Sequence, residues 1–508
     1  MARYLLGIDE GTTGCRACIF DFEGNLVSSD YREYPCYYPR PGWVEQLPED
    51  ITPALYASVK AAIANGKVDP ADIVALGIST QACVVGPLDK DGNLLRPFIS
   101  WQDLRGSEYI EQLTKERISA DDYYAISGAP MNAIFGVTKF AWFRDHEPEL
   151  YEKTAVLSDH QAYFLRAFGV DAGYFADLSS ASRTGLLDVD HHQWSESLFK
   201  AIGLDAAKFP TVVLDTPVVG TVPKSVAEAT GLAEGTQIVV AAHDQNCSTF
   251  GCGLVEGGTA ALVLGTWGSL YVGLDRPIRD PNGVLIVKGN VGPKNWTIEG
   301  AASAAASSYR WFRDTFGGLE VAAGKLLGKD PYDLLNEQVA SVPPGAHGIT
   351  FLPFLQGASA GPRANPFARG VLSGVTLGTT KADIARAVME GITLEMRDIV
   401  EAQRRAGVAL ASIHLTGGGT KSRMWNQMQA DMYQIPVQVL QTPETGALGA
   451  ALYAGVGAGV YTSYKEAAET AVHIKETYEP DPANFAAYDE AYGNFVKVYT
   501  ALHEGKVF

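Results

Sequence analysis

Two aspartates stand at the ends of buried, strand-like segments, where a carboxylate can reach into a cleft. Asp9 follows the apolar run 4–8, and Asp244 follows the run 238–242 with only His243 between them. A carboxylate in such a place can serve as a general base that takes the proton of a reacting hydroxyl. An aspartate at this kind of boundary is also a common helix N-cap. For Asp244 the sequence leaves both interpretations open.

Two turns of similar composition each join a pair of strand-like runs. They contain Gly11, Thr12 and Thr13 in the first copy, and Gly265, Thr266 and Gly268 in the second. Such turns expose backbone N–H groups and hydroxyls without bulky side chains, which suits phosphate oxygens. Each turn taken singly could also be an ordinary hairpin. Asp9 favours the phosphate interpretation for the first copy, because a carboxylate beside a phosphate needs a cation such as Mg²⁺ between them.

A run of glycines follows the strand-like segment that ends at Thr416. It comprises Gly417, Gly418 and Gly419, and it leads through Lys421 and Ser422 into a helix. Glycines let a flat ring lie on the backbone, and a helix N-terminus favours an anion. The chain contains no G-x-x-x-x-G-K-[ST] motif, which excludes a P-loop enzyme.

The repeated turn indicates a repeated domain. The two copies are roughly 250 residues apart, a spacing too long for a solenoid but suited to two related domains that face each other. A chain of 508 residues also exceeds what one hydrophobic core supports. We expect an α/β protein with an N-terminal domain over residues 1–250 and a C-terminal domain over 251–508.

Other elements follow from hydrophobic spacing. The periodicity predicts an amphipathic helix over 383–400 and a C-terminal helix over 485–502. The uncharged segment 445–464 is rich in Ala and Gly rather than Leu, which favours a packed internal helix over a membrane span. Cys15 and Cys18 have C-x-x-C spacing but fall in a strand-like run, so we expect them to pack in a core rather than to do redox or zinc chemistry.

The composition limits the compartment and the partners. Forty basic against 58 acidic side chains give a formal charge of −18, which argues against a nucleic-acid partner. Six cysteines in so long a chain fit a reducing cytoplasm, and the N-terminus lacks the pattern of a secretory signal.

In their order along the chain, these motifs resemble the FGGY family of carbohydrate kinases from end to end. The two Gly/Thr turns resemble the family's phosphate motifs, and 416–422 resembles its adenosine motif. The segment 370–375, together with 383–390, fits a family signature.

The resemblance implies two actin/hexokinase-like (ribonuclease H-like) domains that face a central cleft. The C-terminal domain would bind ATP, and the N-terminal domain a small sugar or polyol. Asp244 would be the catalytic base, and Asp9 with Asp244 would be the candidates for binding Mg²⁺. The implied substrate contacts are Gln81, Ala82, Trp101, Asp103, Asp244 and Gln245. A homodimer is one possible assembly.

The identity of the substrate stays open at this stage. The segment 80–83 reads Thr-Gln-Ala-Cys, unlike the Gly-Gln-Met-His of xylulokinases, and the Arg-Glu pair of glycerol kinases is absent. Because Gln81, Trp101 and Asp103 come without an obvious arginine clamp, we expect a neutral polyhydroxylated substrate rather than an aldonate. Two alternatives remain: an ATPase of the same fold, and a sugar-binding regulator without phosphotransfer, against which the intact Asp9 and Asp244 argue.

Overall fold

A computed structural model describes residues 3–290, 292, 295–358 and 361–508. Its first half is built on a six-stranded sheet in the order β13-β14-β5-β1-β2-β3. The strands are β1 (Tyr4–Glu10), β2 (Gly14–Asp21), β3 (Leu26–Glu33), β5 (Ile73–Thr80), β13 (Val218–Thr221) and β14 (Gln237–Val239). Strands β1 and β5 are buried almost throughout because helices cover both faces of the sheet.

The second half is built on a seven-stranded sheet in the order β17-β18-β16-β15-β21-β22-β23. Its strands are β15 (Gly258–Leu264), β16 (Gly268–Leu274), β17 (Ile286–Gly289), β18 (Trp296–Ala302), β21 (Leu410–Thr416), β22 (Val437–Leu440) and β23 (Ile474–Tyr478). Helices α14 (Lys381–Arg405) and α15 (Arg423–Tyr433) pack against it. The capping box of Thr380 and Asp383 starts α14, which is the helix predicted over 383–400.

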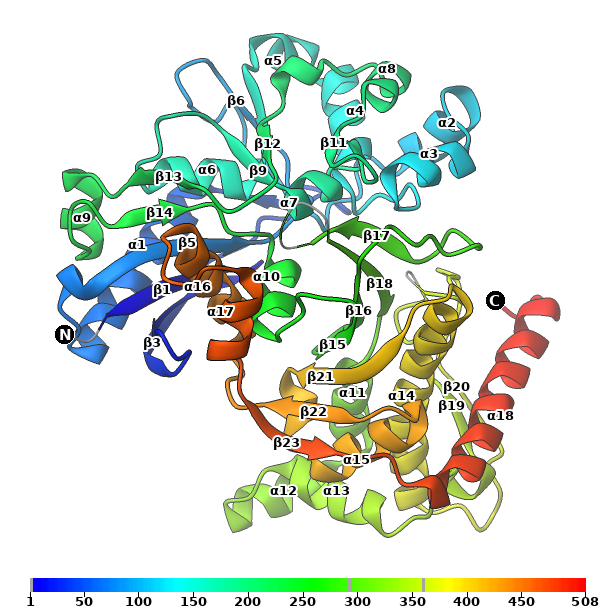
Figure 1. Cartoon of the computed structure of the whole chain (residues 1–508). Helices are drawn as coiled ribbons and strands as arrows, with labels where there is room; N and C mark the ends of the chain where they lie inside the picture. Colours follow the sequence, from blue (N-terminus) through cyan, green and yellow to red (C-terminus); the bar gives the residue numbers. More distant parts are fainter. Residues whose placement is uncertain (1–2, 291, 293–294, 359–360) are drawn as a thin grey trace.

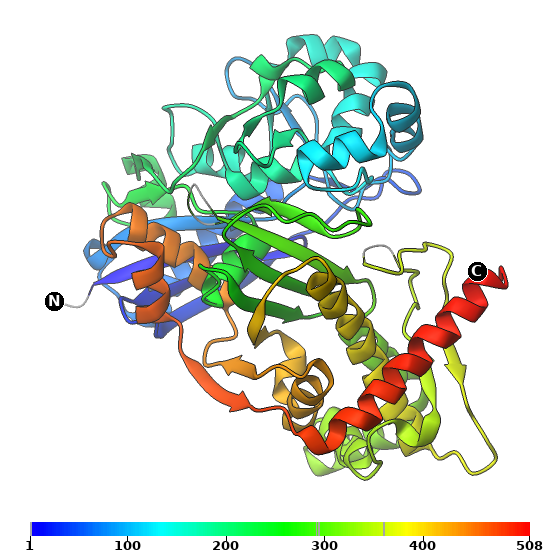
Figure 2. The same ribbon diagram turned by 45° about the vertical axis from the view of Figure 1, so that its right-hand side comes forward.

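The two sheets repeat one arrangement, which confirms the predicted pair of related α/β domains. Strand β1 pairs antiparallel with β2 and parallel with β5, and β15 pairs antiparallel with β16 and parallel with β21. In both sheets the Gly/Thr turn joins the antiparallel pair, so the two turns occupy equivalent positions. In Figures 1 and 2 most of the first half lies above most of the second half.

Most of the remaining elements of the first half come between β3 and β14 in the sequence. The helices are α1 (Pro48–Gly66), α2 (Glu108–Glu116), α3 (Ala120–Ser127), α4 (Gly136–His146), α5 (Pro148–Lys153), α6 (His160–Ala167), α7 (Leu178–Arg183), α8 (Glu196–Ile202), α9 (Lys224–Thr230) and, beyond β14, α10 (Asp244–Gly251). The short strands are β4 (Glu45–Gln46), β6 (Gly86–Leu88), β7 (Phe98–Ile99), β8 (Val156–Ser158), β9 (Phe175–Asp177), β10 (Leu187–Asp188), β11 (Gln193–Trp194) and β12 (Thr211–Val213).

The remaining elements of the second half are helices and one short strand pair, β19 with β20. They are α11 (Ala306–Phe316), α12 (Gly318–Leu327), α13 (Pro331–Ala340), β19 (Thr350–Leu352), β20 (Val371–Ser373), α16 (Thr445–Gly457), α17 (Tyr464–Ala471) and α18 (Phe485–Glu504). The last of these is the predicted C-terminal helix, drawn in red in Figure 1.

Helix α16 returns from the second half to the sheet of the first, and it packs on β1, β5 and α10 (Figure 1). Glycine makes this approach possible, because a Cβ added at Gly449 would lie 1.8 Å from the backbone oxygen of Cys247. The uncharged segment 445–464 therefore does contain a closely packed internal helix. Within the described part of the chain, no helix is long and apolar enough to span a bilayer.

The two cysteines of the C-x-x-C spacing both lie in β2 and are buried. Cys15 packs in a core with Leu6 and Ile8, and Cys18 packs in a different core with Leu5 and Phe20. Residues three apart in a strand point to opposite faces. The structure thus agrees with the packing interpretation of this pair.

Candidate functional site

A cavity of about 460 Å³, here called the central cavity, lies between the two halves. The residues that line it come from both halves and include five of the six expected substrate contacts, Asp244 among them. The polar and aromatic members are Gln81, Trp101, Asn132, Phe135, Arg183, His243, Asp244, Gln245, Trp267, Ser269, Tyr271 and Glu299, and Ala82 lies among the apolar ones.

Asp244 enters the cavity from the first turn of α10, just beyond β14. His243 is the N-cap of that helix, so the alternative interpretation of Asp244 as the cap is not what the structure shows. The Asp244 Oδ1 atom accepts a hydrogen bond from the backbone N–H of Gln245 at 2.7 Å and lies 3.1 Å from His243 Nδ1. Burial raises the pKa of Asp244, and the Gln245 N–H and the Arg183 charge offset part of that rise. With 34% of its side chain exposed, the carboxylate remains accessible from the cavity.

Two of the expected substrate contacts are fixed by the first Gly/Thr turn. The Gln81 side-chain amide donates to Glu10 Oε1 at 2.8 Å and to the backbone oxygen of Gly11 at 3.1 Å. The Trp101 indole N–H donates to Thr12 Oγ1 at 3.0 Å. The first Gly/Thr turn, a predicted phosphate site, thereby orients the Gln81 and Trp101 side chains in the wall of the central cavity.

The expectation that Asp103 contacts the substrate is not met in the structure. Its side chain is fully buried and does not line the cavity, because both carboxylate oxygens are engaged elsewhere. They accept hydrogen bonds from Arg105 Nε at 2.8 Å, from Arg105 Nη2 at 2.7 Å and from the backbone N–H of Val44 at 2.6 Å. Asp103 therefore holds the loop around Val44 and does not face the central cavity.

A charged group of residues that stands in no sequence motif crosses the cavity between the two halves. Arg183 ends α7 of the first half, and its Nη2 atom forms an ion pair with Glu299 Oε2 on β18 of the second half. Glu299 Oε1 accepts from the Tyr271 hydroxyl at 3.1 Å. Lys288 on β17 lies 3.3 Å from Glu299 Oε2 and 3.1 Å from His243 Nε2.

This group is electrically coupled. Burial alone would raise the pKa of Glu299, but the Arg183 and Lys288 charges outweigh it and lower that pKa to about 2. Burial and the nearby Arg183 charge lower the pKa of Lys288 to about 7. Glu299 is thus a carboxylate at any physiological pH and neutralises the arginine on the cavity wall.

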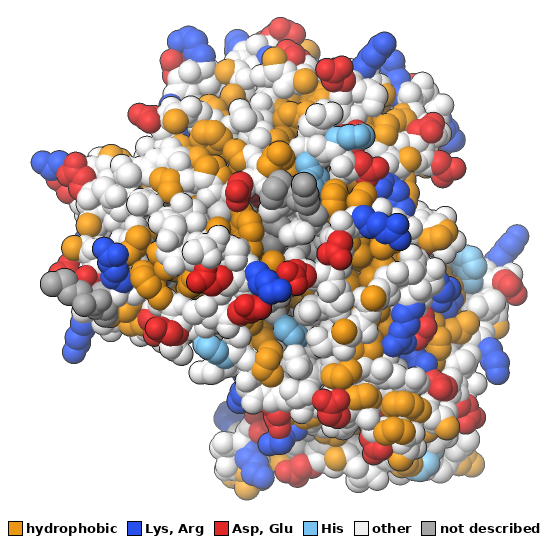
Figure 3. All heavy atoms as spheres, viewed as in Figure 1, with side chains coloured by type: hydrophobic (Ala, Val, Ile, Leu, Met, Phe, Trp, Pro, Cys, Tyr) orange, Lys and Arg blue, Asp and Glu red, His pale blue; other side chains and the backbone are white. Residues whose placement is uncertain are grey.

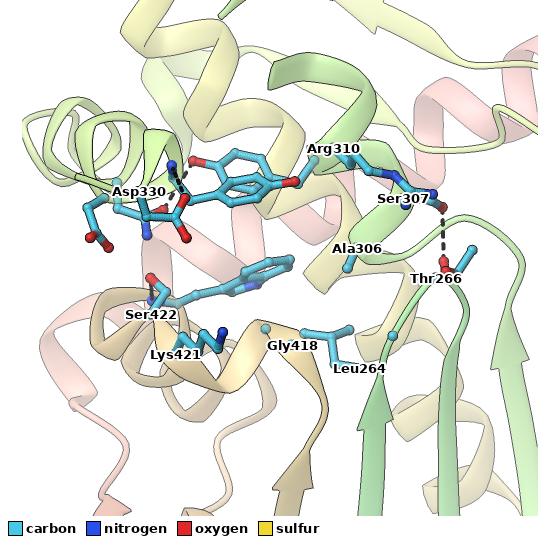
Figure 4. A pocket seen from close by; sticks show the side chains of 16 residues that line it. Leu264, Thr266, Ala306, Ser307, Arg310, Asp330, Gly418, Lys421 and Ser422 are labelled. Atoms are coloured by element: carbon cyan, nitrogen blue, oxygen red, sulfur yellow. Dashed lines mark hydrogen bonds between the residues drawn. The ribbon is translucent and has the colours of Figure 1, made fainter. Parts of the chain in front are cut away.

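A second pocket of about 360 Å³ lies in the C-terminal half. Figure 4 shows Gly418, Lys421 and Ser422 along one side of it, and Asp330 and Arg310 along the opposite side. Gly419, Trp425, Tyr309 and Tyr332 also line it. A flat, hydrogen-bonding ring such as adenine fits between such walls. Gly417 lies behind this wall, in a left-handed conformation against the backbone of Leu264.

The second Gly/Thr turn separates the two spaces. Gly265 and Thr266 line the second pocket, whereas Trp267 and Ser269, from the same turn and the start of β16, line the central cavity. Thr266 also accepts, through its backbone oxygen, a hydrogen bond from the Ser307 hydroxyl at 2.9 Å (Figure 4). Gly268 starts β16 and packs close to Met396 and Ala305.

Asp9 stands at the end of β1 beside the first turn, whose Gly11, Thr12 and Thr13 line neither space. Its Oδ1 atom accepts a hydrogen bond from the Ser79 hydroxyl at 2.8 Å. Burial raises the pKa of Asp9 to about 7, and the carboxylates of Asp244, Glu10 and Glu444 add to that rise. A desolvated carboxylate surrounded by like charges suits a divalent cation that also binds phosphate and water.

The described residues contain no cluster of three or more His, Cys, Asp and Glu side chains that could hold a metal ion by themselves. A cation at Asp9 would therefore need oxygen ligands from elsewhere. Phosphate oxygens and waters are the usual additional ligands of Mg²⁺, so the residues present fit that ion.

Comparisons with known proteins agree with this geometry. The FGGY family of carbohydrate kinases matches through its N-terminal domain over residues 4–251 and its C-terminal domain over 260–458. The chain is 31% identical over 487 residues to the glycerol kinase of Thermococcus gammatolerans, covering 94% of each chain. It is 28% identical to the xylulose kinase of Bacillus subtilis, covering 98% of this chain and 97% of that protein.

Two further similarities span almost the whole chain. It is 27% identical to the gluconokinase of Bacillus subtilis, covering 96% of this chain and 93% of that protein. The fold matches the crystal structure of a ligand-bound xylulose kinase from Lactobacillus acidophilus with a TM-score of 0.90 at 24% identity, covering 100% of both chains. The two family domains, the repeated sheets and the cavity between them together show that the chain belongs to the FGGY family of carbohydrate kinases.

Proposed function

We propose that this carbohydrate kinase transfers the γ-phosphoryl group of ATP to a hydroxyl of a small, neutral, polyhydroxylated compound in the central cavity, with Asp244 as the base. The observation that carries the proposal is the second Gly/Thr turn, because its consecutive residues line both the second pocket and the cavity that contains Asp244. ATP with its adenine beside Gly418 would direct its phosphates along Gly265 and Thr266 toward that carboxylate.

In this mechanism Asp244 would orient the substrate hydroxyl and accept its proton. Oδ1 is already occupied by the Gln245 N–H, and no hydrogen bond to Oδ2 is found among the described residues. Oδ2 is therefore the atom that would accept the substrate's proton as the new O–P bond forms. The backbone N–H groups of the second turn would stabilise charge on the transferred phosphoryl group.

Positioning of the substrate would fall to the first half of the chain. Gln81 and Trp101 are held by the first turn, as described above, so their orientation is fixed before the substrate binds. Preorganised groups of this kind raise the effective concentration of the reacting hydroxyl. Asp9 is the residue that would hold Mg²⁺, an ion that neutralises charge on the β- and γ-phosphates when it is bound.

The class of substrate follows from the charges on the cavity wall. Arg183 is the one cationic side chain that lines the central cavity in the described part of the chain, and it is already paired with Glu299. An aldonate would thus meet Asp244 and Glu299 without a free cation. Glycerol and xylulose, the neutral compounds named for two of the relatives, suit this wall better than the gluconate named for the third.

The substrate class can be tested by ADP release across ketopentoses, deoxyketoses, polyols and aldonates. We expect at least one neutral ketose or polyol to be turned over and aldonates to be poor substrates. Turnover of gluconate with none of any neutral compound would contradict the proposed class, and ADP release that no acceptor accelerates would favour a plain ATPase.

The nucleotide pocket can be tested by filling it at Gly418. No atom lies within 4 Å of a Cβ added at Gly418, so a valine there should fold normally. Its side chain would occupy the wall against which adenine lies, and we expect the KM for ATP to rise about 10-fold or more. Steady-state kinetics and thermal unfolding measure the two effects.

Gly493, on α18 and away from both spaces, is a matched control because an added Cβ there also meets no atom within 4 Å. Gly493→Val should leave the KM for ATP unchanged. An unchanged KM in Gly418→Val would place the nucleotide elsewhere.

A further inference from the structure

Arg183 is a cation in a site that we assign to a neutral substrate. Its side chain is 10% exposed and lines the central cavity, and only its Nη2 atom has a hydrogen-bond partner among the described residues. The remaining N–H groups of the guanidinium are therefore available to oxygen atoms of a ligand. Without a counter-charge, such a guanidinium would bind a carboxylate in preference to a hydroxyl.

Glu299 supplies that counter-charge from the other half of the chain. It reaches the cavity from β18, whose seven residues are all buried, so its backbone position is fixed by the second sheet. Its Oε1 atom is held by the Tyr271 hydroxyl, and its Oε2 atom faces both Arg183 and Lys288. With 8% of its side chain exposed, Glu299 has little freedom to leave the arginine.

Glu299 is the counter-charge of Arg183 on the cavity wall. Lys288, behind the wall, has a pKa lowered to about 7, so it is only partly charged near neutral pH. Loss of the Glu299 charge would leave Arg183 unpaired, at a place where it already offers free donors. The same loss would leave the hydroxyl-binding groups Gln81 and Gln245 in place.

We propose that Glu299 is a specificity-determining residue, which neutralises Arg183 and so makes the central cavity select neutral polyhydroxylated substrates over aldonates. This inference rests on the proposed function, because it concerns the acceptor of the same kinase site. Arg183 then binds a substrate hydroxyl oxygen rather than a carboxylate, and the second half of the chain takes part in substrate selection.

The test compares two probes of equal chain length, gluconate and sorbitol, which differ in one terminal carboxylate. Their binding to the full-length protein is measured by isothermal titration calorimetry, so the result does not depend on turnover. In Glu299→Gln we expect the affinity for gluconate relative to sorbitol to rise by about 10–100-fold, the range of a hydrogen bond to a charged group. Glu299→Asp keeps the charge and should keep the wild-type preference.

Two further variants separate specificity from structure. Glu320→Gln removes a carboxylate from another mostly buried ion pair, with Lys381, that lines neither space, and it should leave the ratio of affinities unchanged. The double variant Glu299→Gln/Arg183→Gln should return the ratio to within about two-fold of wild type, because the unpaired guanidinium is gone.

The inference is wrong if folded Glu299→Gln keeps its affinity for gluconate, relative to sorbitol, within two-fold of the wild-type value. It is also wrong if neither the wild type nor Glu299→Gln binds gluconate. Should Glu299→Gln fail to fold, Arg183→Gln carries the test: the affinity for sorbitol must fall about 10-fold, and an unchanged affinity would overturn the role of Arg183. The ADP-release screen tests the proposed function by turnover, whereas these variants test the inference by binding. A failure of one can therefore be distinguished from a failure of the other.

Discussion

Asp244→Asn is expected to lower kcat by about 10²–10⁴-fold, the usual contribution of general-base catalysis, while the affinity for ATP changes little. Asparagine keeps the shape of the side chain and one acceptor oxygen, so the substrate hydroxyl can still be held. It cannot take the proton. The second pocket contains no part of Asp244, which is why nucleotide binding should be preserved.

The matched control for this substitution is Asp205→Asn. Asp205 is an exposed cap of a short 3₁₀ turn, where asparagine caps about as well as aspartate. That variant should keep wild-type kcat. A folded Asp244→Asn protein with near-normal turnover of its best substrate would show that Asp244 is not the base.

The second large effect is expected at Asp9. Asp9→Asn should lower kcat by about 10²-fold or more and raise the Mg²⁺ concentration that gives half-maximal activity, because an amide is a much poorer ligand for this hard cation. Kinetics over a Mg²⁺ series measure both effects. Normal activity with an unchanged Mg²⁺ dependence would remove Asp9 from the metal site.

The same variant has an opposite effect on stability, which separates a lost function from a damaged fold. The pKa of Asp9 is raised in the folded protein to about 7. Ionisation of Asp9 therefore destabilises the folded state. This destabilisation is complete above pH 7, and it disappears as the pH falls toward the ordinary pKa of an aspartate, near 4. In metal-free, nucleotide-free buffer at pH 8, Asp9→Asn should therefore melt at or above the wild-type temperature. At pH 4 this advantage should disappear. A lower melting temperature at pH 8 would contradict the desolvated environment of Asp9.

Features set by local sequence were predicted well. The Gly/Thr turns lie between antiparallel strands as expected, because glycine and threonine mark such turns wherever strand-like runs flank them. Asp244 was singled out because it follows a buried, strand-like run with only His243 between them, and it lines the central cavity. Gln81, Ala82, Trp101 and Gln245 were assigned from the family resemblance, and all four line the central cavity.

Asp103 is the one expected contact that does not line the central cavity. Its partner Arg105 stands only two residues away, yet the sequence does not tell whether a nearby arginine will turn toward the aspartate or toward solvent. In the structure the Arg105 guanidinium also stacks over Trp43, 3.8 Å from the centre of its ring, and this packing fixes the pair in the interior. The tertiary contact therefore decides the role of Asp103.

Residues that meet only through the fold could not be predicted. Arg183 and Glu299 are 116 positions apart and belong to different halves of the chain, and neither stands in a recognisable motif. One wall of the second pocket, with Tyr309, Arg310 and Tyr332, likewise comes from helices that have no local signal for binding. The expected boundary between residues 250 and 251 assigns α16 to the second domain, whereas in the structure α16 packs on the sheet of the first half.

The net charge of the chain says less about its function than the few charges that line the central cavity. On the face shown in Figure 3, acidic and basic side chains are interspersed, so the net charge of −18 does not form a single patch there. The chemistry instead depends on the few charges that line the cavity between the halves.

The most direct test of the account is a crystal structure of the protein with a non-hydrolysable ATP analogue and its best substrate. We predict adenine in the second pocket beside Gly418, the terminal phosphate at the turn of Gly265 and Thr266, and one substrate hydroxyl about 3 Å from Asp244 Oδ2. A nucleotide bound outside that pocket, or a substrate with no hydroxyl within hydrogen-bonding reach of Asp244, would contradict the account.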